Sequence, residues 1–367
     1  MISIILPAYN CGHEIGALLD CVARSELTPR EVIVVDDCST DDTRAICEAR
    51  PEVRLIRQDR NRGPAAARNL GAAHAGGEIL FFIDSDVLLP EDRDVLKEMG
   101  EAFDRRPDID MLSTVSHPQP RVPSAIAYNN SIYHYYYMQR FFADRARDMG
   151  PPDHARERVG RIMFFSTRLG AVRTQSFKRS GGFMESLTGV MNEDGEYGVR
   201  CYHLGFVNYL NSRLVNLHRY PTDSRRYTRS YYHAAFVQAQ IAEQFDTTAD
   251  ETTSGSERIR RLLACCAFLV PLPFIVCSPQ TGFAVLAAWA LAMGIMLRPL
   301  GRLIREHVPP RYWIGWLVVY IAITPLILIG YGAGKLQYRR GRVKLVYPPS
   351  THPYFDAEAR TVQEEQA

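Results

Sequence analysis

Short apolar runs and amphipathic segments alternate along the first 90 residues. The run at 31–37 is rich in β-branched residues and lacks polar alternation, so it predicts a strand buried on both faces. The short apolar runs at 3–9, 53–58 and 78–84 predict further strands. Apolar residues at helical spacing predict helices between them, at 13–25, 39–50 and 63–75. We expect Ser39 or Thr40 to cap the second helix. This order predicts a doubly wound α/β sheet whose ligands lie beyond the carboxyl ends of the strands.

The next stretch continues the pattern less regularly. A helix is predicted at 90–107 and a strand at 110–116, and Asn192 with the acids that follow it predicts a helix start. Residues 207–218 predict either two edge strands or one bent strand. The aromatic residues of 128–142 either pack internally or face an acceptor or lipid headgroups.

Two segments near the C-terminus carry no charged residue, at 262–297 and 312–334. Because about 20 apolar residues span a bilayer, they predict a membrane region over 262–334 with two or three hydrophobic helices. Pro271 and Pro273 either divide the first segment into a hairpin or kink a single span. Basic residues flank every segment, and the positive-inside rule places all three flanks on one side of the membrane. A re-entrant or interfacial element would reconcile these flanks with the number of spans.

This pattern divides the chain into a cytosolic domain at 1–245, a polar and basic linker at 246–261, the membrane region, and a cytoplasmic basic and polar tail at 335–367. The N-terminus has no basic region before its apolar run, so it is not a secretory signal. The eight cysteines form no CxxC pair or zinc-like spacing and indicate a reducing compartment. We therefore expect the protein at the cell (inner) membrane, with its catalytic domain in the cytoplasm and no nucleic-acid partner.

Carboxylates follow two of the predicted central strands, where they are expected to converge. Asp36 and Asp37 end one strand, and Asp84 and Asp86 follow another. Four carboxylates in one crevice need a cation or ligand hydrogen-bond donors. Oxygen ligands suit Mg²⁺ or Mn²⁺ completed by phosphates, and Arg68 offers a positive charge for phosphate. Neither GxxxxGK[ST] nor GxGxxG is present, so the pattern indicates a nucleotide-diphosphate site of another kind.

Five motifs occur along the chain in this order: "SIILPAYN", "EVIVVDDCSTDDT", "NRGPAAARNLGAAHAGGEILFFIDSDVLL", "SGGFMESL" and "NEDGEYGVRCYHLGF". Together they resemble the family 2 glycosyltransferases, and the resemblance covers residues 1 to about 220. It implies the GT-A fold, a mixed doubly wound sheet here followed by C-terminal transmembrane or interfacial helices. It also implies a UDP- or GDP-sugar donor and Mg²⁺ or Mn²⁺ as cofactor.

The resemblance implies a role for each matching position. Residues around the nucleoside and the donor sugar would be Pro7, Tyr9, Asp36, Asp37, Arg68, Asp84 and Ser85. Asp86 would ligate the metal, together with Asp84. His218 is either a third metal ligand or a strand-end histidine satisfied by the protein itself. Asp194 in "NED" would be the catalytic base, with Glu193 orienting groups beside it.

Asp194 suits base catalysis because an acceptor hydroxyl must lose a proton as it attacks the anomeric carbon. One base and one in-line displacement invert the anomeric centre. Its place at a predicted helix start would lower its pKa and keep it ionised. The other interpretation is that Asp194 is an ordinary acidic residue at the start of a helix.

These features predict inverting, metal-dependent transfer of a single sugar to a hydroxyl of a lipid-linked or membrane-associated glycan. The QxxRW element of the processive synthases in the family is absent, which favours transfer of one sugar over polymerisation. One alternative is a polyprenyl-phosphate glycosyl synthase, whose phosphate acceptor needs no base. Another is an inactive nucleotide-binding membrane scaffold. We expect membrane lipids among the partners.

Overall fold

The computed structural model describes residues 1–143, 157–160, 162–187, 192–245 and 279–341. These residues fold into two compact units. The first unit contains Met1–His117 and Phe142–Arg219, and the second contains Pro118–Phe141 and the described residues of Tyr220–Lys344. Each unit is described by itself below.

This division differs from the predicted one. Two parts of the predicted catalytic domain, 118–141 and 220–245, belong to the same unit as the C-terminal helices. The predicted linker at 246–261 lies outside the described residues, as do the first part of the predicted membrane region and the tail beyond residue 341.

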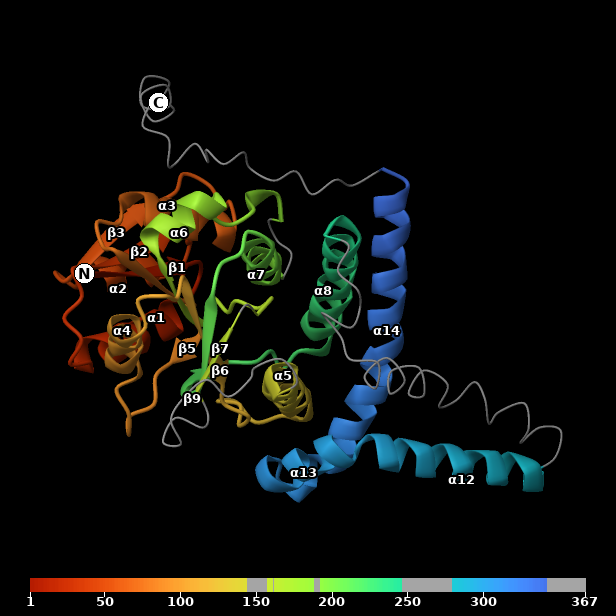
Figure 1. Ribbon diagram of the computed structural model, residues 1–367. Helices are drawn as coiled ribbons and strands as arrows, with labels where there is room; N and C mark the ends of the chain where they lie inside the picture. The colour runs from red at the N-terminus through yellow and green to blue at the C-terminus, as the bar shows by residue number, and fades with distance from the viewer. Residues whose placement is uncertain (144–156, 161, 188–191, 246–278, 342–367) are drawn as a thin grey trace. The chain divides into compact units, whose positions relative to one another are not determined.

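Four parallel strands form one half of the sheet of the first unit, in the order β3-β2-β1-β4 (Figure 1). Helices connect them, as the alternating pattern predicts, so the carboxyl ends of these strands meet at one edge. The elements are β1 (Ile2–Ala8), α1 (Gly12–Arg24), β2 (Glu31–Asp36), α2 (Thr43–Glu48), β3 (Val53–Arg57), α3 (Pro64–His74) and β4 (Ile79–Ile83).

The other half of the sheet is mixed. Strand β8 is antiparallel to both β4 and β6, β9 is parallel to β6, and β5 and β7 are antiparallel to β9. The elements of this half are β5 (Val87–Leu88), α4 (Val95–Arg105), β6 (Met111–Ser116), β7 (Glu157–Gly160), β8 (Leu169–Arg173), α6 (Thr174–Ser180), η2 (Glu185–Leu187), α7 (Glu193–His203) and β9 (Asn208–His218). The predicted α/β class with a mixed sheet is confirmed.

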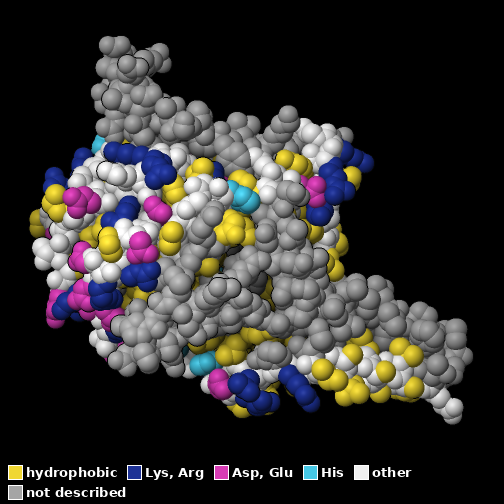
Figure 2. All heavy atoms as spheres, in the orientation of Figure 1, with side chains coloured by type: hydrophobic (Ala, Val, Ile, Leu, Met, Phe, Trp, Pro, Cys, Tyr) yellow, Lys and Arg dark blue, Asp and Glu magenta, His cyan; other side chains and the backbone are white. Residues whose placement is uncertain are grey.

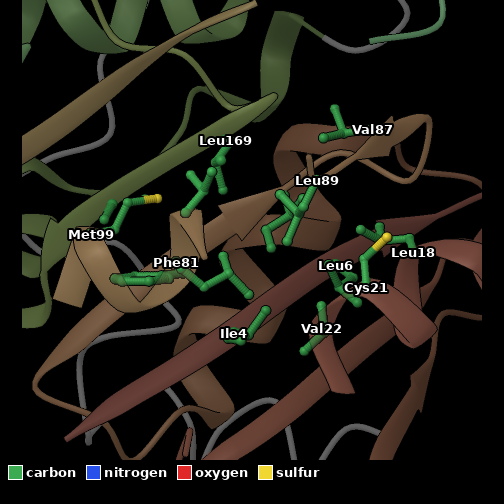
Figure 3. Packing of buried hydrophobic residues seen from close by; sticks show 14 of the residues in the cluster. Ile4, Leu6, Leu18, Cys21, Val22, Phe81, Val87, Leu89, Met99 and Leu169 are labelled. Carbon is green, nitrogen blue, oxygen red and sulfur yellow. The ribbon is translucent and has the colours of Figure 1, made fainter. Parts of the chain in front are cut away.

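Both faces of the central strands are buried, which explains their continuous apolar sequences. Ile4 and Phe81 belong to one hydrophobic cluster, whereas Ile5 and Phe82 belong to another. Successive strand residues point to opposite faces, so β1 and β4 each supply both clusters. Figure 3 shows the first cluster, in which side chains of β1 and β4 meet those of α1, α4 and β8.

Two local predictions are decided by the structure. The segment 207–218 is one strand, β9, with an irregular register against β6 between Ser113 and Val115. The predicted cap by Ser39 or Thr40 is wrong, because α2 begins only at Thr43. The backbone N of Ser39 instead donates to Asp36 Oδ1 at 2.9 Å, which ties this segment to the end of β2.

The described part of the second unit is helical. Its elements are α5 (Ala125–Ala143), α8 (Ser224–Gln244), α12 (Pro279–Met296), α13 (Arg298–His307), η3 (Pro310–Tyr312) and α14 (Trp313–Arg339). A hydrophobic cluster joins Tyr128 and Ile132 of α5 to Leu300 of α13 and to Trp316 and Tyr320 of α14. Part of the aromatic stretch 128–142 therefore packs internally, which is one of the two roles that the sequence allowed for it.

One helix of the described residues is long and apolar enough to cross a membrane. It covers Pro310–Arg339, with a mean hydropathy of 2.1 over its most apolar window. A third of that window is buried within the protein, so length and composition are weak evidence that it spans a bilayer.

Candidate functional site

The segments that carry the predicted site residues meet at one edge of the sheet in the first unit. Asp84 comes directly after β4, and its backbone N donates to the carbonyl oxygen of Arg168 at 3.2 Å. Arg168 precedes β8, whose antiparallel pairing with β4 places Leu169 opposite Ile83. The end of β4 and the start of β8 therefore lie side by side.

Arg68 of α3 connects two of the predicted site segments. Its Nη2 donates to Asp84 Oδ1 at 2.6 Å, and its Nη1 donates to Glu193 Oε1 at 2.7 Å. The residue is 2% exposed, and its guanidinium lies 5.5 Å from the centre of the Phe183 ring. Burial lowers the pKa of Arg68, but Asp84 and Glu193 outweigh burial and raise the pKa above its usual value. One buried cation thus holds the end of β4 and the start of α7 together.

The next residue, Asn69, holds the bend that leads toward α7. Its Nδ2 donates to the Phe183 carbonyl at 2.9 Å and to Glu185 Oε1 at 3.0 Å. Its Oδ1 accepts from the backbone N of Phe183 at 2.8 Å. Two successive residues of α3 therefore position the acidic residues and the bend before them.

Asp194, the predicted base, is the second residue of α7, and its Oδ1 accepts from the backbone N of Gly195 at 2.8 Å. Burial, followed by the charge of Glu193, raises the pKa of Asp194 to about 7, and Arg168 and Arg68 offset only part of this effect. The predicted lowering of this pKa is wrong. Loss of water and an adjacent negative charge outweigh the favourable end of the helix.

Asp86 and His218 form a second pair of predicted site residues. Strand β5 pairs with the end of β9, which places Val87 opposite His218. His218 Nε2 lies 3.2 Å from Asp86 Oδ1, and the backbone N of Arg219 donates to the Asp86 carbonyl at 3.1 Å. Burial raises the pKa of Asp86, but His218 and Arg168 outweigh it and leave that pKa below its usual value. An ionised carboxylate and an imidazole therefore lie together.

Asp36 and Asp37 are buried at the end of β2. Asp37 Oδ1 accepts from Gln58 Nε2 and from the backbone N of Arg62, and Oδ2 accepts from the backbone N of Gly63, each at 2.8 Å. Both oxygens of Asp37 thus bind the segment that leads into α3. The predicted contact of this residue with a nucleoside stays a prediction.

The remaining predicted donor-site residues lie in nearby elements of the sheet. Pro7 is buried within β1, whereas Tyr9 follows that strand and is 48% exposed. Ser85 lies between the two aspartates that follow β4, and its hydroxyl forms a hydrogen bond with the thiol of Cys11. Tyr9 is therefore the one of the three with a side chain largely open to a ligand.

The structure brings most of the predicted residues into two groups. The first group contains Arg68, Asp84, Glu193 and Asp194, and the second contains Asp86 and His218. The side chain of Arg168 interacts electrostatically with Asp86 and with Asp194, one residue from each group. Asp36 and Asp37 are instead held by segments around β3 and the loop after it.

Sequence reasoning missed Arg168. Its Nη1 also lies within hydrogen-bond distance of Ser116 Oγ, at 3.4 Å. The available signal was an arginine directly before a short apolar run, "RLGAV". Its importance depends on that run pairing antiparallel to β4, which the sequence does not specify.

The predicted metal ligands form an incomplete set. Among the described residues, no three His, Cys, Asp or Glu side chains form a group that could hold a metal ion. Asp84 is bound by Arg68, so Asp86 and His218 remain as a pair of oxygen and nitrogen donors. Such donors fit Mn²⁺ or Mg²⁺ when phosphate oxygens complete the coordination.

Part of this chain is similar in sequence to known proteins. The sequence model of "Glycosyl transferase family 2" matches residues 3–165. The succinoglycan biosynthesis protein ExoO of Rhizobium meliloti is 41% identical over 105 residues, which cover 28% of this chain and 30% of that protein. A glucosyltransferase of Escherichia coli, WfgD, is 35% identical over 88 residues, covering 23% of this chain and 35% of its own length. The chain thus matches only about a third of each relative.

A solved structure resembles nearly the whole chain. The mannosyltransferase PcManGT from Pyrobaculum calidifontis, in complex with GDP-Man and Mn²⁺, has a TM-score of 0.52 and 24% sequence identity, with 89% of this chain and 86% of that chain covered. At this identity the likeness concerns the fold. The curved mixed sheet is that of the GT-A glycosyltransferases. Residues 3–165 are a family 2 glycosyltransferase domain.

Proposed function

We propose that this protein is an inverting, metal-dependent glycosyltransferase. It would transfer a single sugar from a nucleotide-diphosphate sugar to a hydroxyl of a lipid-linked or membrane-associated glycan. The observation that carries the proposal is the bridge from Asp84 through Arg68 to Glu193, at 2.6 and 2.7 Å. It joins the residues expected to hold the donor to the residues expected to activate the acceptor.

Asp194 is the proposed general base. Its pKa of about 7 suits this role, because a base is most effective when its pKa lies near the working pH. A carboxylate with an ordinary pKa would be a weaker base, and Asp194 gains basicity from burial beside Glu193. Asp194 would accept the acceptor hydroxyl proton during attack on the anomeric carbon.

The leaving nucleoside diphosphate needs positive charge. Asp86 and His218 would hold Mg²⁺ or Mn²⁺, which when bound neutralises charge on the diphosphate. Arg168 adds a cation beside Asp86, and Arg68 adds one beside Asp84. The Mn²⁺ and GDP-Man in the structure of PcManGT support this arrangement by analogy of fold.

The donor and acceptor classes rest on the relatives. WfgD is named as a glucosyltransferase that acts from UDP-Glc on a sugar of diphosphoundecaprenol, and ExoO is named as a succinoglycan biosynthesis protein. We therefore propose a UDP- or GDP-sugar donor and a lipid-linked or polymeric glycan acceptor. The apolar helix α14 supports a place at the inner membrane, with the first unit in the cytoplasm.

The proposal is tested by incubating purified protein with a panel of UDP- and GDP-sugars and measuring release of the nucleotide, with Mn²⁺ and with EDTA. We expect release from one donor class, with loss in EDTA. Nucleotide binding without turnover on any donor or acceptor would favour the inactive-scaffold alternative.

Asp86→Ala is the variant that tests the metal pair, and Asp92→Ala on the nearby surface serves as its control. We expect Asp86→Ala to remove metal-dependent donor binding in calorimetry and to lower turnover by more than tenfold. Full activity of Asp86→Ala in Mn²⁺ would exclude Asp86 as a metal ligand.

A further inference from the structure

Helix α14 packs along α8 so closely that side chains are excluded at two points. A Cβ atom at Gly330 would come within 2.6 Å of the Tyr232 carbonyl oxygen, and one at Gly334 within 2.2 Å of the Phe236 carbonyl oxygen. Small residues permit such close approach of two helix backbones. Figure 1 shows the two helices running side by side in the second unit.

Ion pairs extend this contact to the ends of both helices. Glu243 of α8 accepts from Lys335 Nζ at 3.0 Å and from Arg339 Nε at 3.0 Å. The contacts advance in the same direction along both chains, so α8 and α14 are parallel. Both helices rise about 1.5 Å per residue, which places Arg225 and Arg229 beside the middle of α14.

The arginines of α8 are incompatible with the interior of a bilayer. Arg225, Arg226 and Arg229 are exposed. An arginine at the centre of a spanning helix is costly to insert into a bilayer. If α14 crossed the membrane with α8 attached, all three would lie near mid-depth. The contact with α8 therefore argues against a transmembrane α14.

The opposite face of α14 is apolar and exposed. Ile314 is 80% exposed, Val318 and Ile329 are each 59% exposed, and Leu336 is 49% exposed. The face toward α5 and α8 buries Trp316 instead. The exposed side chains therefore form an apolar stripe along α14, and an exposed apolar patch of this kind marks a surface that binds a membrane or another protein.

Positive charge flanks this stripe at both ends. Exposed arginines on and after α13 precede it, and others follow it, at Arg298, Arg302, Arg305, Arg311, Arg339 and Arg340. Figure 2 shows the Lys and Arg side chains near α13 next to the exposed hydrophobic side chains of α12. Anionic headgroups attract such clusters. Both clusters can meet headgroups of one leaflet only if both ends of α14 lie on the same side.

We propose that α14 is an in-plane membrane anchor. Its stripe of Ile314, Val318, Ile329 and Leu336 binds the acyl chains of one leaflet, and its two basic ends bind anionic phospholipid headgroups of that leaflet. This inference rests on the proposed membrane association and is independent of the sugar-transfer chemistry.

The test is cysteine accessibility at the two ends of α14. Arg311→Cys and Arg340→Cys are made separately in a full-length protein without its native cysteines, with Arg225→Cys as the water-exposed control. A membrane-impermeant maleimide is applied to spheroplasts and to inverted vesicles. We expect all three sites to react only in inverted vesicles. Reaction of Arg311→Cys and Arg340→Cys from opposite sides would overturn the in-plane arrangement while leaving membrane association intact.

Two further outcomes show whether lipid or another copy of the chain covers the stripe of α14. Recovery of the full-length protein in the soluble fraction would overturn the membrane association itself. Val318→Cys and Ile329→Cys test for a second copy on the stripe, and we expect no disulfide-linked dimers in membranes treated with an oxidant. Efficient dimer formation would mean that another copy, and not lipid, covers the stripe.

Discussion

Two arginine–carboxylate networks include an acidic residue of the first turn of α7, and they differ in how completely the protein satisfies the arginine. In the first, Arg200 binds Glu196 through two hydrogen bonds, at 2.7 and 2.9 Å. Its remaining donors bind the carbonyl oxygens of Ser180 and Gly182. Every side of this guanidinium is occupied by the protein, as expected for a structural element.

The second network is less complete. Arg68 binds Asp84 and Glu193, but its buried Nε has no hydrogen-bond partner among the described residues. Next to it, Asp194 has a pKa of about 7. Buried polar groups are normally satisfied, so this network is less complete than that of Arg200. The comparison teaches that burial of charge alone does not distinguish the two networks, whereas the strongly raised pKa of Asp194 beside one of them does.

The largest expected effect is the loss of kcat when the proposed base, Asp194, is replaced. Asp194→Asn removes the proton acceptor without changing side-chain size, and general base catalysis contributes roughly 10²–10⁴-fold. We expect kcat to fall by about that factor while donor binding persists, as measured by turnover and by calorimetry. Unchanged turnover on the true acceptor would favour the polyprenyl-phosphate synthase alternative, whose acceptor is already ionised.

Disrupting the network of Arg200 and Glu196 should lower the stability of the protein but not its catalytic rate. Arg200→Met leaves Glu196 buried without its cation, and breaking a buried pair by removing one partner costs about 3–5 kcal/mol. Denaturant unfolding should detect this loss, while the rate per folded molecule stays close to wild type. Lys178→Met, at an exposed site on α6, is the control and should change stability by less than about 0.5 kcal/mol.

The double variant Glu196→Gln/Arg200→Met sharpens this result. Because it removes both charges, it should recover much of the stability lost in Arg200→Met. A double variant as unstable as the single one would mean that Arg200 acts mainly through its bonds to Ser180 and Gly182.

The first half of the fold could be predicted from the sequence because β1, β2 and β4 are buried on both faces and each helix lies between two strands. Strand β5 could not, since its two residues form a strand only by pairing with β9, far along the chain. The membership of 118–141 in the helical unit is likewise a tertiary fact.

The candidate site follows the same division. Asp84 and Asp86 lie between β4 and β5, and Glu193 and Asp194 begin α7, so their sequence positions predicted their edge of the sheet. The pKa of Asp194 could not be predicted, because the sequence indicates a helix start but not the burial of that start. Arg168 was missed because the direction of β8 decides its position.

A smaller effect is expected from the bridge itself. Arg68→Lys keeps the charge but cannot bind Asp84 and Glu193 through two arms of one planar group. Losing a hydrogen bond to a charged group costs about 1.5–3 kcal/mol of stability, and kcat/KM of the folded protein should also fall, by roughly tenfold or more, because Asp84 and Glu193 lose their shared partner. The matched change Arg200→Lys should lower stability by a similar amount and leave kcat/KM close to wild type, and an unchanged kcat/KM in Arg68→Lys would contradict the comparison.

The smallest effect is a shift in pH dependence. A base with a pKa of about 7 is ionised only above that pH, so the wild-type kcat should rise with pH and reach half its plateau near pH 7. Glu193→Gln removes a negative charge that raises this pKa, while its amide oxygen can still accept from Arg68. The midpoint should then move to lower pH, by less than about one unit. A midpoint that stays in place or moves upward would show that Glu193 does not set the basicity of Asp194.

The raised pKa of Asp194 should also make the folding stability of the wild-type protein depend on pH. Because the raised pKa means that the folded state holds the Asp194 proton more tightly than the unfolded state, this group's contribution to stability is largest below about pH 4. That contribution is lost as the pH rises toward 7, and stability falls there by linkage. Denaturant unfolding of wild type and Asp194→Asn across this range isolates the contribution, because Asn does not titrate. Parallel stability curves for the two proteins would mean that the pKa of Asp194 is not raised in the folded state.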